Sequence, residues 1–206
     1  MNYESLKKAI VDFPDLVGEA DLEAYVQTII ELAEARINRD VRLRGHLRSQ
    51  YVSGTLSEHP LPADYLDLDR LTGPNGEALE VRPADELERI GTPPSGPRFY
   101  AIDGTRLIFV PEISGMRLFY YQKPAPLRSA PGGTNWLLDK APDLYLYAGL
   151  CEAARFSKES EQEYTRFEQA YARIAGALIQ SDAESRLPRS SPIRSIPRTG
   201  RRASTI

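Results

Sequence analysis

The segment 142–150 constrains the fold of this chain more strongly than any other, because its sequence is that of a helix buried on several sides. Pro142 suits the first position of a helix, and Asp143 complements the positive end of the helix dipole. The rest of the segment is apolar almost all round, as is typical of a helix packed between other elements or between subunits. Just upstream, Asn135 can cap or turn the chain and Trp136 can fill a core. The sequence of this stretch therefore predicts a helix that packs against other elements of the fold or against other subunits.

Helical patterns lie on both sides of a β-rich middle part. Apolar residues at spacings of three and four predict a helix over about residues 3–13. A second helix is expected from an N-cap at Asp21 to about Arg42. Downstream of Trp136 the helices return, and Ser160 begins a capping-box pattern for a helix that should fade near Ser185.

Between about residues 49 and 127, proline and glycine recur among short β-rich runs. The pair Asp103-Gly104 predicts a hairpin turn between two strands. The expected elements are strands near 61–68, 98–102, 106–110 and 116–121, with a short helix at 84–90.

These patterns predict an α+β protein, in which an α-helical bundle carries an inserted small antiparallel β subdomain and an extended C-terminal arm. The bundle is assigned to residues 1–48 and 131–185, the β subdomain to 49–130 and the arm to 186–206. One core, or one core with a small insertion, is what 206 residues can bury.

The arm is purely cationic. Its candidate binding residues are Arg186, Arg189, Arg194, Arg198, Arg201, Arg202 and the terminal Ile206. Because the whole chain has a net charge of −3, removing these six positive charges leaves residues 1–185 at −9. Arginines among serine and proline could neutralise phosphates, dock into an acidic groove on a protein, or form a solubilising end.

The sequence offers little for catalysis or for binding a cofactor. The two histidines, His46 and His59, have no metal-ligand spacing, and the single cysteine is expected to be a buried apolar residue. A carboxylate cluster at Asp64, Asp67 and Asp69 fits the solvent side of a strand better than a metal or acid–base site. We therefore predict no catalytic, cofactor-binding or metal site, and a chain that is not an enzyme.

Two further features bear on partners. The arginines near the end of the second helix suit a helix carboxyl end and either contact an acidic partner or cap the helix in solvent; they are Arg36, Arg39, Arg42 and Arg44. No apolar run approaches the roughly 18 residues that span a bilayer, and the N-terminus lacks a signal-peptide pattern. A cytosolic origin and no membrane partner are expected.

Four segments, taken together and in order, resemble the head-to-tail adaptor (connector) family of tailed bacteriophages. They are residues 32–42 (LAEARINRDVR), 61–66 (LPADYL), 97–102 (PRFYAI) and 134–138 with 142–147 (TNWLL and PDLYLY). The resemblance extends over about residues 3–185 and includes no catalytic signature.

The resemblance implies a structural virion protein that forms a ring, typically of twelve copies, between the portal and the tail or nozzle proteins. Its arm would reach the portal, and DNA would pass through the channel without specific binding. The expected location is the head–tail interface of the virion, and the host cytoplasm during assembly. Two alternatives remain: a nucleic-acid-binding accessory protein that uses the arginine arm, and a small cell-wall hydrolase acting through Asp64 to Asp69. Some podovirus adaptors are credited with the latter activity, but no matching acid pair is present here.

Overall fold

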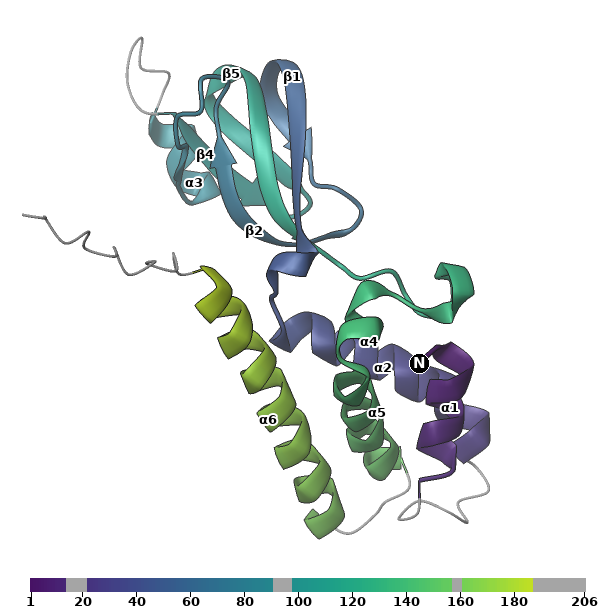
Figure 1. Ribbon diagram of the computed structural model, residues 1–206. Helices are drawn as coiled ribbons and strands as arrows, with labels where there is room; N and C mark the ends of the chain where they lie inside the picture. The colour runs from purple at the N-terminus through teal and green to yellow at the C-terminus, as the bar shows by residue number, and fades with distance from the viewer. Residues whose placement is uncertain (14–21, 91–97, 157–160, 187–206) are drawn as a thin grey trace, which may run out of the picture.

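The computed structural model describes residues 1–13, 22–90, 98–156 and 161–186, and these contain six α-helices and five β-strands (Figure 1). In chain order the elements are α1 (Tyr3–Val11), α2 (Leu22–Asp40), a 3-10 turn η1 (Arg44–His46), β1 (Leu47–Pro60), β2 (Tyr65–Thr72), β3 (Glu80–Val81), α3 (Ala84–Ile90), β4 (Phe99–Asp103), β5 (Arg106–Gln122), η2 (Pro131–Gly133), α4 (Trp136–Lys140), α5 (Pro142–Phe156) and α6 (Glu161–Arg186).

The helices gather around α5, which packs against α1, α2, α4 and α6 (Figure 1). Its consecutive residues Ala148–Ala154 are all buried, so the prediction of a helix covered on several sides is confirmed. Pro142 is its first residue, as expected. The core around it is formed by large apolar side chains that are almost completely buried, among them Leu6, Ile10, Ile29, Ile37, Leu144 and Phe167.

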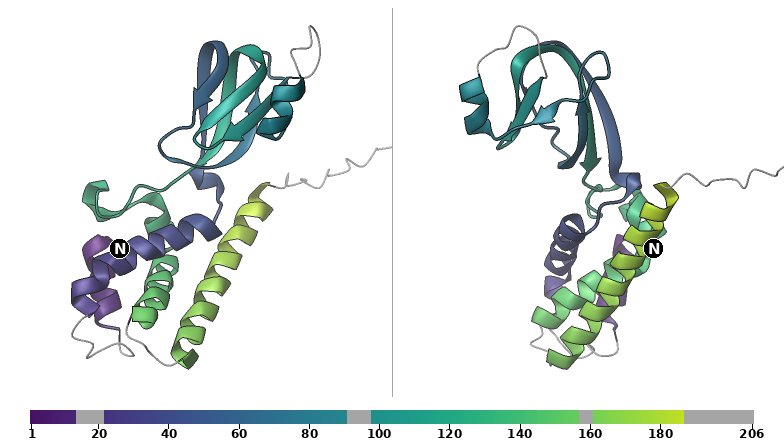
Figure 2. Two further views of the ribbon diagram at one scale, coloured as in Figure 1. Left: turned by 180° about the vertical axis from the view of Figure 1, so that it is seen from behind. Right: turned by 90° about the vertical axis from the view of Figure 1, so that its left-hand side faces the viewer.

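The strands form one strongly curled sheet above the helices, in which the long strand β5 pairs with β1, β2 and β4 (Figure 2). These three pairings are antiparallel, and residues 103 and 106 pair beside the predicted Asp103-Gly104 turn. The short strand β3 runs parallel to β4. The sheet is therefore mixed, and the expectation of a purely antiparallel subdomain is wrong in that detail.

The two faces of the sheet are covered differently. One face closes on its own core, in which Leu107, Ile113 and Leu118 are completely buried. On the other face, α3 packs Leu87 against Phe99 and Ala101. This alternation follows from the two-residue period of a strand, which sends neighbouring side chains to opposite faces.

Element boundaries agree with the sequence predictions in part. The helix at 84–90 is confirmed, whereas α1 ends at Val11 and α2 at Asp40, each about a turn or less before its predicted end. The strands expected at 106–110 and 116–121 are one continuous strand. The predicted caps at Asp21 and Ser160 lie outside the described residues.

Candidate functional site

The joint between the helices and the sheet is an aromatic contact. His46 of η1 and Trp136 of α4 lie edge to face, with ring centroids 4.7 Å apart. Gly45 allows this approach, because a Cβ at that position would lie 2.5 Å from the Trp136 ring. Trp136 is thus partly buried at the joint and does not fill the centre of the core.

The joint is also held by hydrogen bonds from Asn135. Its side-chain oxygen accepts from the backbone N–H groups of Leu137 and Leu138, at 3.1 and 2.9 Å, which confirms the expected capping role. Its amide nitrogen donates to the carbonyl of Ala125 (2.9 Å) and lies 3.0 Å from the Tyr145 hydroxyl of α5. One buried amide therefore connects the segment leaving the sheet with α4 and α5.

His46 is a titratable group of the joint. Burial is the main cause that lowers its pKa to about 4, and the charge of Arg42 lowers the pKa further. The ring is 1% exposed, so it is neutral in the folded protein near pH 7. The arrangement suits a packing contact and gives His46 no role as a proton donor at that pH.

An ionic cluster centred on the buried pair Arg36 and Glu152 connects α2, α5 and α6. Arg36 lies 3.6 Å from Glu152 and 3.7 Å from Asp40, and it donates a short hydrogen bond to Glu168. Its guanidinium also lies 4.3 Å from the ring centroid of Tyr171, whose hydroxyl donates to Asp40 at 2.9 Å.

Arg36 and Glu168 stabilise each other in the charged form. Burial by itself would lower the pKa of Arg36, but the hydrogen bond to Glu168 and nearby charges outweigh burial, so the pKa is raised. The same hydrogen bond lowers the pKa of Glu168. Burial raises the pKa of the neighbouring Cys151 thiol to about 12, which keeps it protonated. The cluster therefore connects the three helices α2, α5 and α6 through side-chain contacts.

The arginines predicted to form a helix cap or a partner-binding surface thus divide into two groups. Arg36 is buried in the ionic cluster, and Arg42 pairs with Asp67 at 3.5 Å. Arg39 and Arg44 are exposed. The interpretation as a solvated cap is wrong for Arg36, because its side chain is buried and two of its partners, Glu152 and Glu168, lie on helices more than a hundred residues further along the chain.

Two of the three carboxylates that could be candidates for acid–base work, Asp64 and Asp67, have structural partners. Asp64 accepts a hydrogen bond from the Tyr120 hydroxyl at 3.1 Å, and Asp67 pairs with Arg42. Asp67 and Asp69 are exposed along β2, as a half-buried strand predicts. Within the described part of the chain, no group of three or more His, Cys, Asp or Glu side chains could hold a metal ion.

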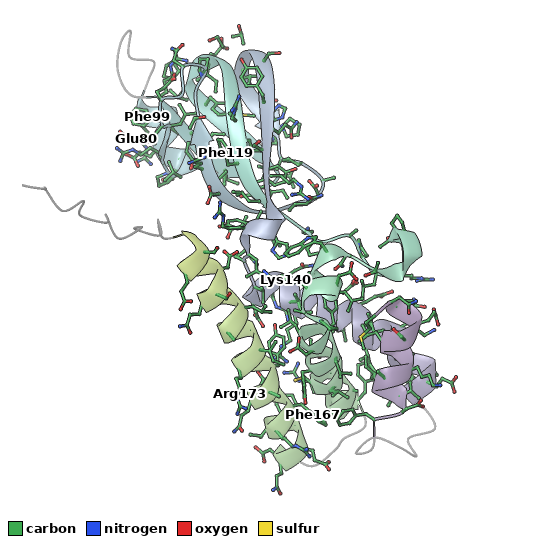
Figure 3. The ribbon with its side chains drawn as sticks, viewed as in Figure 1. Glu80, Phe99, Phe119, Lys140, Phe167 and Arg173 are labelled. Carbon is green, nitrogen blue, oxygen red and sulfur yellow. The ribbon has the colours of Figure 1, made fainter. Side chains whose placement is uncertain are left out.

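The cationic arm begins at Arg186, the last residue of α6. The other predicted arm residues, Arg189, Arg194, Arg198, Arg201, Arg202 and Ile206, lie outside the described residues. In Figure 3, Phe167 and Arg173 lie on different sides of α6; the former is buried in the core and the latter is exposed.

Fold and contacts together define a mixed helical and β protein whose buried polar clusters hold its elements together. The chain belongs to the family described as SU10 adaptor protein, which it matches over residues 1–195. A comparison with curated proteins gave no match. The resemblance noted from the sequence is thereby confirmed.

Membership in this family identifies a phage structural adaptor protein and points to a structural, non-enzymatic role in the virion. An adaptor of this kind interacts with other phage head or tail proteins. Among the described helices, none has the length and apolar character needed to cross a membrane.

Proposed function

We propose that this protein is a head-to-tail adaptor that forms a ring, joins the portal to the tail or nozzle protein and lets DNA pass. The observation that carries the proposal is the family match over residues 1–195. Closed rings need heterologous interfaces, in which one surface of a subunit meets a different surface of the next. A ring of twelve copies is the form expected from the sequence resemblance.

Exposed apolar side chains on the helical part support contacts between copies. Tyr25 of α2 and Phe156 of α5 stack with ring centroids 5.7 Å apart, although they are 49% and 44% exposed. Leu32, two turns further along α2, is 42% exposed. On α6, Ile179 is 40% exposed, and Figure 2 (right) shows α2 and α6 on different sides of this part. Exposed apolar side chains on two different helices suit a heterologous interface, which joins different surfaces of neighbouring subunits.

The arm is proposed to attach the ring to the portal. Residues 186–206 are cationic, whereas residues 1–185 carry a charge of −9, so the arm is the part of the chain best suited to an acidic groove on a partner. Since α6 ends at Arg186, a chain cut after that residue keeps every described helix.

Native mass spectrometry and electron microscopy of the full chain, with and without purified portal, test the proposal. We expect portal to carry a ring of twelve adaptor copies, and the chain cut after Arg186 to stay folded but lose attachment. A full chain that remains monomeric with portal would contradict ring formation. A cut chain that attaches as well as the full chain would contradict the role of the arm alone.

A further inference from the structure

A hollow of about 620 Å³ lies on the outer face of the curled sheet. Two arginines and two aromatic residues from three strands line it: Tyr51 of β1, Arg70 of β2, and Arg117 and Phe119 of β5. The turn that follows β2, around residues 73–78, forms its rim. Figure 3 shows Phe119 on the sheet, away from the helices.

Strand register brings these side chains to one face. Arg117 pairs with Tyr51 on one side and with Thr72 on the other, and Phe119 pairs with Arg70. Because side chains alternate along β5, the residue between them, Leu118, points into the sheet core and is fully buried. The hollow therefore lies on the sheet face opposite the core, at the end of β5 far from α3.

Both arginines of the hollow lack an anionic partner in the described part of the chain. The Arg70 guanidinium lies 4.0 Å from the ring centroid of Phe119, and Arg117 is exposed. The residues that line the hollow include no acidic side chain. Glu77 of the rim turn folds back on that turn, where its carboxylate accepts from the backbone N–H of Asn75 at 2.9 Å, and in the described part of the chain no ion pair joins it to either arginine. Elsewhere on the sheet, an exposed arginine such as Arg106 is paired, at 2.9 Å from Glu58. Two neighbouring cations that take part in no ion pair within the described residues form a site for an anion.

The strand positions of the two arginines define the ligand further. Arg70 and Arg117 occupy diagonal positions on adjacent strands, where backbone positions are about 7–8 Å apart. Two carboxylates at alternate positions of an extended chain are separated by roughly 7 Å, since each residue rises about 3.4 Å. An arginine fork binds a carboxylate through two parallel hydrogen bonds.

We propose that this hollow binds an acidic, extended segment of a partner protein. Carboxylates at alternate positions would pair with Arg70 and Arg117, and an apolar side chain of the segment would contact Tyr51, which is 57% exposed. Aromatic residues and arginine are the types enriched at protein interfaces. Duplex DNA fits less well, because its many phosphates would be repelled by the acidic remainder of the chain, whereas a short segment brings few charges. The inference does not depend on ring formation or on the arm.

The test is an NMR titration of the full chain at low salt with a synthetic peptide of alternating glutamate and serine. A peptide of alternating glutamine and serine is the neutral control, and a short DNA duplex is the competing probe. We expect backbone amides of β1, β2 and β5 around the hollow to shift with the acidic peptide only. The variant Arg70→Gln/Arg117→Gln should bind about tenfold more weakly, which corresponds to about 1.4 kcal/mol.

A charge-matched control, Arg48→Gln/Arg173→Gln, removes two exposed arginines elsewhere and should bind the peptide like the unmodified chain. Arg117→Gln alone keeps the Arg70–Phe119 contact and should still weaken binding, which separates loss of the site from loss of the fold. The arm can bind the same peptide or DNA, so only residues outside it decide. Shifts spread over all basic residues of the helices and the sheet, larger shifts around the hollow with DNA than with the peptide, or shifts of the hollow that depend only on protein concentration would each overturn the proposal.

Discussion

His46 is a single buried residue that makes stability depend on pH. Its pKa is about 4 in the folded protein and about 6.5 when exposed, so unfolding takes up a proton between these pH values. Stability is therefore expected to fall as the pH drops from about 6.5 to 4, by up to about 3 kcal/mol from this residue. Urea unfolding at a series of pH values measures the slope.

His46→Phe keeps a ring against Trp136 but cannot titrate, so it should flatten that slope. His59→Gln changes the other histidine and should leave it unchanged. If His46→Phe and the unmodified protein lose stability equally between pH 6.5 and 4, the buried histidine is not the cause.

Gly45 is a residue whose lack of a side chain matters for packing. A Cβ there would lie 2.5–2.9 Å from three atoms of the Trp136 ring, so Gly45→Ala should force the ring to move and cost about 1–3 kcal/mol. Gly176 is the matched control, because a Cβ on this mid-helix residue meets no heavy atom within 4 Å. Gly176→Ala should be neutral or stabilise by up to about 1 kcal/mol. Thermal unfolding compares them, and equal effects would contradict the packing argument.

At the scale of elements, the ionic cluster around Arg36 determines how α2, α5 and α6 fit together. Arg36→Met would leave Glu152 buried with one cation fewer, and removal of one member of a buried pair costs about 3–5 kcal/mol. Arg106→Met is the control, since Arg106 and Glu58 are both more than half exposed and such pairs contribute at most about 1 kcal/mol. Denaturant unfolding of both variants tests this, and similar losses would argue against a special role for the cluster.

Sequence patterns predicted those elements whose signals are local. The helix at 84–90, the Asp103-Gly104 turn and the Asn135 cap all depend on neighbouring residues, and all three are present. Strand β5 was predicted as two strands because Pro111 and Gly115 interrupt its apolar pattern. In the structure it continues through both, and the pairing with β1 shifts register in the same region.

Features that depend on distant residues could not be predicted in the same way. The parallel pairing of β3 with β4 involves two residues and leaves no periodic signal. Arg36 has the sequence context of an exposed helix end, and its burial follows only from contacts with α5 and α6. The hollow at Arg70 and Arg117 likewise requires the register of three strands. Short helices, turns and caps could therefore be predicted from neighbouring residues. The ionic cluster and the hollow could not, because both depend on contacts between distant parts of the chain.

At the scale of the whole molecule, charge is divided between an acidic part and a cationic arm, and this division bears on how DNA would pass a ring of such chains. A surface of the same sign as DNA repels it and limits adhesion. If residues 1–185, at −9, dominate, the free protein should not retain duplex DNA at physiological salt.

Any binding at low salt should come from the arm. Six arginines can release few counterions, so the slope of log affinity against log salt should be no steeper than about −5. The slope should almost vanish in a chain cut after Arg186, which loses five of the six. Fluorescence anisotropy with a labelled duplex over a salt series measures both. Binding that persists at physiological salt, or that survives loss of the arm, would favour the nucleic-acid-binding alternative. DNA that slides through an adaptor must be bound weakly at every phosphate, so tight binding would contradict that role.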